Sequence, residues 1–400
     1  MILPAIMLFF VAFVISWIGV GLAKHYARRL GLMDDPGHRK VHVVATPRNG
    51  GIGIFAGFAL PLAVGLIGVA YLSAVQSHGM PKRYATTENA SAVHNGQVSV
   101  LGREVPSFVL DQLPGMRAHA PLAWLFLAAA LAIHLLGLLD DRKPMAAWPK
   151  LLAQFVIAIA LVGVGEVIET GGFRVLTFLG NYPEPYFFIS AFASVLWIVA
   201  LTNAFNFLDH MDGLSAGVAF ICGGIFLITA GQNGQWFICA MLLLFLGSLL
   251  GFLVYNFPPA SIFMGDGGSM LLGFILSALT IRTTFLPVGE SFANRWYALL
   301  APLIILAVPL YDLLIVSVLR LARGRSPMMG DTNHFSHRLT RHGFTKRGAV
   351  LVIYAVTMAT GITAPLLARV DDTAALLLFG QLCGMLIVIG LLERVGEHTT

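Results

Sequence analysis

The sequence predicts an all-α, polytopic integral membrane protein with about eleven transmembrane helices. Hydrophobic residues make up 57% of the 400 residues and charged residues only 11%, whereas soluble domains carry roughly 25% charged residues. The apolar residues form long runs, and a run of about 20 residues is enough for a helix to cross a hydrocarbon layer roughly 30 Å thick. Five aspartates stand at the ends of these runs, where a charge avoids the bilayer centre.

The eleven predicted spans follow one another along the whole chain. They are residues 2–23, 51–73, 121–139, 150–168, 186–203, 214–231, 236–255, 268–287, 297–319, 348–368 and 373–392. The first run has no basic residue before it and is followed by Lys24, Arg28 and Arg29, so we expect an anchor and not a cleaved signal peptide. This order predicts an N-terminus outside and a C-terminus in the cytoplasm. With that topology, 17 of the 25 Lys and Arg residues face the cytoplasm, as the positive-inside rule requires.

One integral domain, residues 1–400, is expected, with residues 74–119 as an extracytoplasmic loop insert. Within the insert, Gln97–Leu101 could form a short strand, and an outer loop at 170–185 is a second hairpin candidate. The net charge of +5 does not indicate a nucleic-acid partner, because the basic residues cluster where anionic lipid headgroups would meet them. All three cysteines lie inside predicted spans, which argues against a disulfide framework.

Two adjacent acids, Asp140 and Asp141, close the third span. Adjacent carboxylates repel each other, so the pair favours a nearby cation or the retention of a proton, and either property suits a general base. Lys150 opens the next span and could supply a positive charge. The alternative is a solvated helix end that pairs with the basic residues directly after it.

Polar residues recur at three-residue steps where the fifth span ends: Asn203, Asn206, Asp209 and Asp212. Residues three apart share one face of a helix, and amide and carboxylate oxygens are ligands for hard cations such as Mg²⁺. Gly213 follows as a break before the next span. The alternative is a polar seam that holds helices together.

A glycine-rich loop leads into the eighth span around Asp266. Such loops let backbone N–H groups approach an oxyanion at a helix N-terminus. A carboxylate at that place repels a phosphate, so Asp266 next to a phosphate requires a metal between them. The alternative is that Asp266 only caps the helix.

A cytoplasmic loop contains His334, His337 and Arg338, a density of basic groups typical of a phosphate clamp. A zinc site is disfavoured because no cysteine lies nearby. The remaining alternative is a basic loop that faces anionic lipid. Lys40, in the first cytoplasmic loop, adds another basic group at the same surface.

Taken together, these motifs resemble the polyprenyl-phosphate N-acetylhexosamine-1-phosphate transferase superfamily (glycosyltransferase 4 type), from about residue 30 to about residue 360. The basic loop resembles most the undecaprenyl-phosphate N-acetylglucosamine-1-phosphate transferase branch. The resemblance implies a Mg²⁺-dependent enzyme, with Mn²⁺ as a substitute, that acts at the cytoplasmic face of the plasma membrane. A polyprenyl phosphate would attack a UDP-sugar, with UDP-N-acetylglucosamine as the expected donor, releasing UMP in the first membrane step of a cell-envelope polysaccharide pathway. A homodimer is compatible with it.

The resemblance also assigns roles residue by residue. The metal would be held by Asn206 and Asp266. The catalytic group would be Asp140 or Asp141 as the base and Asp209 beside the reacting phosphates. The substrates would be bound by Lys40, Lys150, Asn203, Asp212, Phe263, His334, His337 and Arg338. Phe263 would stack on uracil, and Asp212 would contact the nucleoside.

Two residues depart from the family pattern. His210 stands where a glycine is usual, and Ser336 replaces the middle histidine of the basic loop. Exchanging Ser336 for histidine is therefore expected to be tolerated. Two other functions stay open: a phospho-N-acetylmuramoyl-pentapeptide transferase-like activity, and a membrane transporter. The transporter is disfavoured because transporter sites tend to lie near the bilayer midplane.

Overall fold

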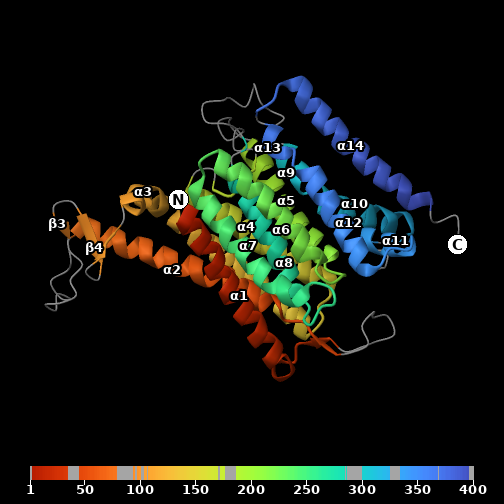
Figure 1. Ribbon diagram of the computed structural model, residues 1–400, viewed down its shortest axis with the longest axis horizontal. Coiled ribbons are helices and arrows are strands. Elements are labelled where there is room, and N and C mark those ends of the chain that lie inside the picture. Colours follow the sequence, from red (N-terminus) through yellow and green to blue (C-terminus); the bar gives the residue numbers. More distant parts are fainter. Residues whose placement is uncertain are drawn as a thin grey trace.

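A computed structural model gives an all-α bundle of membrane-length helices (Figure 1). It describes residues 2–34, 45–78, 93–94, 97–100, 103–105, 107–169, 172–175, 186–283, 285, 300–324, 334–367 and 369–395. Within these ranges, nine helical segments are long and apolar enough to cross a membrane. The protein is therefore a multi-pass membrane protein, as the sequence predicts.

The nine segments correspond to nine of the eleven predicted spans. They are α1 (Ile2–Leu30), α2 (Gly51–His78), α3 (Ser107–Arg142), α4 (Ala147–Ile168), α5 (Tyr186–Leu208), α6 (Leu214–Gln232), α7 (Trp236–Asn256), α12 (Lys346–Gly361) with the short α13 (Ala364–Leu367), and α14 (Asp372–Val395). The other helices are α8 (Asp266–Arg282), α9 (Ala301–Ile305), α10 (Ala307–Ala322) and α11 (Phe335–Arg341).

The two remaining predicted spans differ from the expectation in length and continuity. Helix α8 has 17 residues, or about 26 Å at 1.5 Å per residue. It is buried from Gly267 to Thr280 and packs against α2, α3, α5, α6 and α7, so protein and not lipid sets its length. The predicted span 297–319 is interrupted at Leu306, which separates α9 from α10.

The non-helical part of the predicted insert is shorter than the predicted range of residues 74–119. Helix α2 continues to His78 and α3 already begins at Ser107, so 74–78 and 107–119 are helical and not loop. The polar first turns of α3 hid this from the hydropathy pattern. The predicted strand is present as β4 (Gln97–Val100), which pairs antiparallel with β3 (Val93–His94) and β5 (Arg103–Glu104). This small sheet stands away from the bundle (Figure 1). The hairpin candidate at 170–185 lies mostly outside the described residues.

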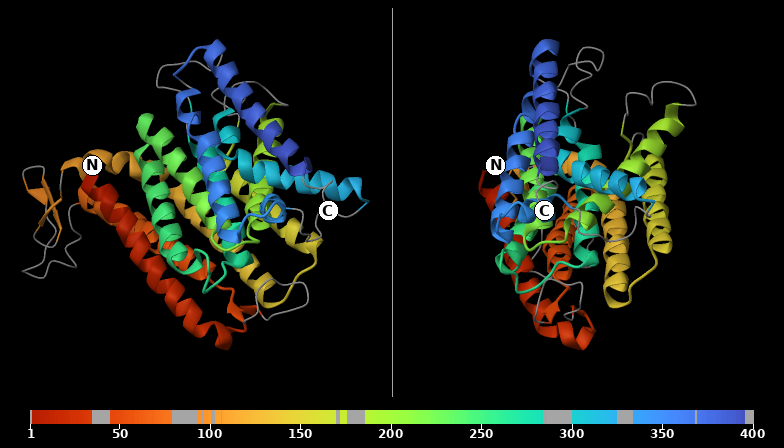
Figure 2. Two further views of the ribbon diagram at one scale, coloured as in Figure 1. Left: turned by 45° about the vertical axis from the view of Figure 1, so that its right-hand side comes forward. Right: turned by 90° about the vertical axis from the view of Figure 1, so that its right-hand side faces the viewer.

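Close helix packing depends on glycines. Apolar burial does not drive association inside a lipid bilayer, so small residues that let backbones approach are favoured at helix interfaces. Helices α1 and α7 lie side by side although they are far apart in sequence (Figure 2). A Cβ on Gly251 of α7 would meet the backbone nitrogen of Trp17 at 2.8 Å, so only glycine allows this spacing.

Short connections bring one end of the bundle together. The segments 143–146, 209–213 and 257–265 join α3 to α4, α5 to α6 and α7 to α8. The C-terminal ends of α3, α5 and α7 therefore lie beside the N-terminal ends of α4, α6 and α8. A two-stranded pairing of β1 (Met33–Asp34) with β2 (Thr46–Pro47) joins α1 to the same region. All the acids singled out from the sequence belong to these connections or to the adjoining helix turns.

Candidate active site

Lys150 brings two of the predicted acids together. It lies in the first turn of α4, and its Nζ is 2.9 Å from Oδ2 of Asp140 at the end of α3. The same ammonium forms an ion pair with the carboxylate of Asp266, the first residue of α8. Three helix ends thus converge on one cation. Asp266 is partly exposed (31% of its side chain), so part of its carboxylate remains accessible.

Asp141 has a different environment from its neighbour. Only 3% of its side chain is exposed, and its two carboxylate oxygens accept hydrogen bonds from the backbone N–H groups of Asp266 and Gly267, both at 2.9 Å. These N–H groups have no partner inside α8, so Asp141 caps that helix from α3. The guanidinium of Arg48 lies 3.7 Å from the Asp141 carboxylate. Asp141 therefore holds the helix that carries Asp266.

Two further groups on α3 fix the first turn of α8. His134 forms a 2.8 Å hydrogen bond from Nδ1 to the carbonyl of Gly267 and stacks on Phe55. One turn later, a Cβ on Gly137 would meet the Cα of Gly267 at 2.5 Å, so the glycine permits the close crossing of the two helices. Sequence analysis missed His134; a histidine inside an apolar run is the signal that could have indicated it.

The two asparagines of the polar stripe face different neighbours. Asn203 donates to Oε1 of Gln154 on α4 at 2.6 Å. Asn206 donates through Nδ2 to the hydroxyl of Ser269 on α8 at 2.9 Å. Because the amide nitrogen makes this bond, the amide oxygen of Asn206 is left as an acceptor.

The two aspartates that follow α5 are near the acid cluster but play different local roles. Asp212 accepts a 3.0 Å hydrogen bond from the backbone N–H of Ala260, and so ties two connections together. Within the described residues, no hydrogen bond or ion pair reaches the carboxylate of Asp209. Burial and the negative charges of Asp266 and Asp141 raise the pKa of Asp209 well above its usual range. The negative charges of the acid cluster therefore act on Asp209, and no described cation is bound to its carboxylate.

Asn256 and Tyr354 hold the connections at this end. Asn256 accepts from the backbone N–H of Gly213 at 2.8 Å and donates to the carbonyl of Ile262 at 2.9 Å. The hydroxyl of Tyr354 donates to the carbonyl of Gly213, whose positive φ of 74° suits glycine. Phe263 is half-buried, and its backbone bonds to Pro47 and Gly50. Sequence reasoning found Phe263 but not the two residues that position its loop.

The basic loop is anchored by an aspartate inside the bundle. Asp312 on α10 is 1% exposed; its carboxylate is 2.8 Å from Nδ1 of His334 and accepts the backbone N–H of Phe335 at 2.8 Å. His337 and Arg338 follow on α11. Burial and the neighbouring His334 lower the pKa of His337. Sequence analysis missed Asp312, although a carboxylate in the middle of an apolar run was a signal for it.

The structure thus gathers most of the predicted residues at one end of the bundle. Lys40 lies outside the described residues. Among those residues, no group of three or more His, Cys, Asp or Glu side chains forms a ready-made metal cluster. Mg²⁺ is commonly held by one or two carboxylates together with substrate phosphates, so an all-protein cage is not required here.

Residues 123–284 match the model of glycosyl transferase family 4. The chain is 31% identical over 362 residues to a probable undecaprenyl-phosphate N-acetylglucosaminyl 1-phosphate transferase of Bacillus subtilis, covering 88% of this chain and 83% of that protein. The chain belongs to glycosyl transferase family 4. It is also 31% identical to a decaprenyl-phosphate N-acetylglucosaminephosphotransferase of Mycobacterium tuberculosis, over 97% of this chain and 89% of the relative.

A relative from the other branch matches a much smaller part of the chain. A phospho-N-acetylmuramoyl-pentapeptide-transferase of Lactobacillus gasseri is 33% identical, but over only 40% of this chain and 51% of that protein. The N-acetylglucosamine enzymes match across nearly the whole chain. The family assignment makes the chain a phosphoglycosyltransferase and places the gathered acids in an enzyme.

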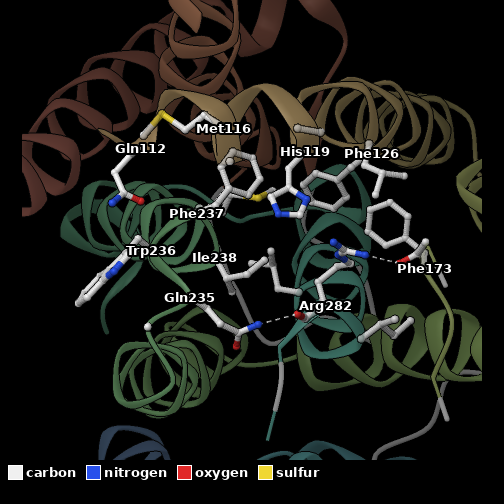
Figure 3. A pocket seen from close by; sticks show the side chains of 18 residues that line it. Gln112, Met116, His119, Phe126, Phe173, Gln235, Trp236, Phe237, Ile238 and Arg282 are labelled. Carbon is white, nitrogen blue, oxygen red and sulfur yellow. Dashed lines mark hydrogen bonds between the residues drawn. The ribbon is translucent and has the colours of Figure 1, made fainter. Parts of the chain in front are cut away.

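A well-formed cavity lies at the opposite ends of α3 and α8 from these acids. Its volume is about 480 Å³ and its walls come from α3, α7 and α8. Figure 3 shows His119 and Arg282 beside the same space, among aromatic side chains. Arg282 donates to the carbonyl of Gly172 at 2.8 Å and to Glu169 at 3.2 Å. Because its guanidinium is already engaged, we assign the chemistry to the acidic end and not to this cavity.

Proposed function

We propose that the protein transfers N-acetylglucosamine-1-phosphate from UDP-N-acetylglucosamine to a polyprenyl phosphate. An oxygen of the lipid phosphate forms a bond to the phosphorus that carries the sugar, the bond from that phosphorus to UMP breaks, and polyprenyl-diphosphate-N-acetylglucosamine results. The observation that carries the proposal is the convergence of Asp140, Lys150 and Asp266 from three helix ends, in a chain that matches N-acetylglucosamine enzymes along almost its full length.

Asp140 is the better candidate for the base of the two adjacent acids. Both oxygens of Asp141 are used by the N-terminus of α8, whereas Asp140 bonds to Lys150 and to the backbone N–H of Met145 and caps no helix in the described part of the chain. Lys150 favours the ionised form of Asp140, which is the form that accepts the proton of the lipid phosphate. Phosphoryl transfer needs positioning and charge neutralisation more than covalent participation by the protein.

The residues fit a divalent cation. The carboxylate of Asp266 and the amide oxygen of Asn206 are hard oxygen donors. The negative charges of Asp266 and Asp141 act together with burial on Asp209, so a cation placed among these acids would be attracted. Asp266 and Asn206 would hold Mg²⁺. When bound, the ion would neutralise the charge of the diphosphate during transfer. His334, at the N-cap of α11, and the basic groups of α11 would bind the diphosphate from the other side.

The active site is proposed to face the cytoplasm, where nucleotide sugars are available. The connections that hold the acids belong to the segments predicted to be cytoplasmic, and 17 of the 25 Lys and Arg residues fall on that side. The transporter alternative is weakened by the family match and by the position of the acids at helix ends.

The test is transfer by the purified protein in detergent. Labelled UDP-N-acetylglucosamine and undecaprenyl phosphate should give UMP and labelled lipid with Mg²⁺, and neither product with EDTA. UDP-N-acetylmuramoyl-pentapeptide, assayed in parallel, tests the second branch. Asp266→Asn should lower turnover roughly 100-fold or more, because a charged group that stabilises the transition state is lost. Asp372→Asn, at an exposed position of α14, is the matched control. Wild-type turnover from Asp266→Asn would refute the metal role, and no UMP release with either donor would refute the function.

A further inference from the structure

His210 and Ser336, which the resemblance to the family leads us to expect as departures from its pattern, touch each other. His210 follows α5 and Ser336 lies on α11, 126 residues further along the chain. The Nε2 atom of His210 is 2.5 Å from the Ser336 hydroxyl, and Ser336 is fully buried. The sequence gives no reason to connect these two positions; only the fold brings them together.

The hydrogen bonds fix which nitrogen of His210 carries the proton. Nδ1 is 2.8 Å from the carbonyl of Phe207, and a carbonyl can only accept, so Nδ1 is the donor. Nε2 is then the acceptor for the hydroxyl of Ser336. Burial and the neighbouring His334 lower the pKa of His210 to about 3, which agrees with a neutral ring. With both nitrogens engaged, His210 has no donor left for a substrate.

The ring of His210 instead supports the two histidines of the basic loop. Its centroid is 4.3 Å from that of His334 in a stacked arrangement and 5.0 Å from that of His337. Asp312 holds Nδ1 of His334. His334 is therefore fixed by a carboxylate at its edge and by an imidazole on its face.

We infer that His210 is a positioning residue whose imidazole fills the buried space between the end of α5 and position 336 of α11. It holds His334 and His337 in the arrangement that binds the diphosphate of the nucleotide sugar, and it docks the loop of Asp209 onto α11. The identity of the bound diphosphate rests on the proposed function, whereas the contact between His210 and Ser336 does not depend on it. One imidazole occupies the space between the two segments, and either position 210 or position 336 can supply it.

This packing changes the expectation for Ser336→His. The sequence alone suggests that the exchange is tolerated, since it restores a family residue. In the structure the new ring would enter a buried space that His210 already fills, and overpacking of a buried site is destabilising. The exchange should be tolerated only when His210 is removed at the same time.

A double-mutant cycle tests the inference. His210→Gly and Ser336→His are each expected to lower kcat/KM about tenfold, mainly by raising KM for the UDP-sugar, whereas the double variant should return to within about threefold of the wild type, because residues in direct contact are strongly non-additive. His25→Ala, at an exposed position of α1, is the control and should leave kcat/KM unchanged. If either variant fails to fold, His210→Gln and Ser336→Ala form a second, milder cycle, in which the double variant should lose no more than the His210→Gln variant alone, because either exchange already removes the hydrogen bond between the two residues.

The apparent Tm of the ligand-free protein is measured for the same wild type, single variants and double variant, and this measurement requires no turnover. Coupled changes in both kcat/KM and Tm support the inference. Additive changes in Tm would show that the two residues do not share one space, and coupled Tm with additive kcat/KM would show a purely structural contact; either result overturns it. If the wild type shows no turnover, the proposed function fails. The comparison of Tm values still tests the contact between His210 and Ser336.

Discussion

Asparagine exchanges at the adjacent acids Asp140 and Asp141 should have opposite consequences for stability and turnover. In Asp141→Asn, one oxygen can still accept an N–H from the start of α8, but the new amide group faces the other N–H and cannot accept it. One charge-assisted hydrogen bond to a buried group is lost, and the charge partner of Arg48 is lost with it. A hydrogen bond to a charged group contributes about 1.5–3 kcal/mol, so we expect a destabilisation of about 2 kcal/mol.

In Asp140→Asn, little stability should be lost. The 2.9 Å ion pair of Asp140 with Lys150 is lost, but the exchange also removes the repulsion between Asp140 and Asp266. The side chain keeps an oxygen for the N–H of Met145, and Lys150 keeps Asp266 as its partner. Turnover should nevertheless fall roughly 100-fold or more, which is the usual contribution of a general base.

The assay is the apparent Tm in detergent together with kcat. Domains of 150–250 residues shift by roughly 2–4 °C per kcal/mol, and the shift becomes smaller with chain length, so Asp141→Asn should lower Tm by about 3 °C. Asp140→Asn should lie within about 1 °C of the wild type by the same scaling. An unchanged Tm in Asp141→Asn, or a larger loss in Asp140→Asn, would refute the division of roles between cap and base.

Two further exchanges test the geometry of the same site. Gly137→Ala should destabilise the protein by roughly 1–3 kcal/mol and lower turnover, because its Cβ collides with the start of α8; Gly163→Ala on α4, where nothing lies within 4 Å, is the control, and equal Tm values for the two variants would contradict the close crossing. Asp209 has a raised pKa, so its contribution to stability is fully present below its usual pKa of about 4 and is lost as the pH rises through the raised value. The Tm of the metal-free protein should therefore fall as the pH rises above about 4 towards the raised pKa of Asp209, and Asp209→Asn should flatten that decline; an identical slope in both proteins would count against the burial of this carboxylate.

The sequence was informative wherever a property depends on residues near each other in the chain. Apolar runs predicted the helices, because the bilayer requires every backbone polar group to be satisfied within the segment. The same rule failed for α3, whose polar first turns resemble a loop, and for α8, which lies among other helices and does not have to match the thickness of lipid. Burial by protein, which hydropathy does not measure, decided the case of α8.

The acids illustrate the same division. Their types and spacing were sufficient to indicate one acidic site, since aspartates at helix ends are costly unless they have a function. The spacing could not distinguish Asp140 from Asp141, because the difference depends on which carboxylate meets the N-terminus of a helix more than 120 residues away. The anchoring of His334 by Asp312 was invisible for a similar reason.

By itself, the sequence determined that this chain is a multi-helix membrane protein with acids and basic groups of a phosphotransferase at its helix ends, because composition and short-range spacing carry that information. Tertiary structure alone decided which acid supports a helix and which remains available for chemistry. It also decided that a histidine and a serine 126 residues apart share one buried space. Hydrogen bonds and steric exclusion act over a few ångströms, and only folding sets which distant side chains come within that range.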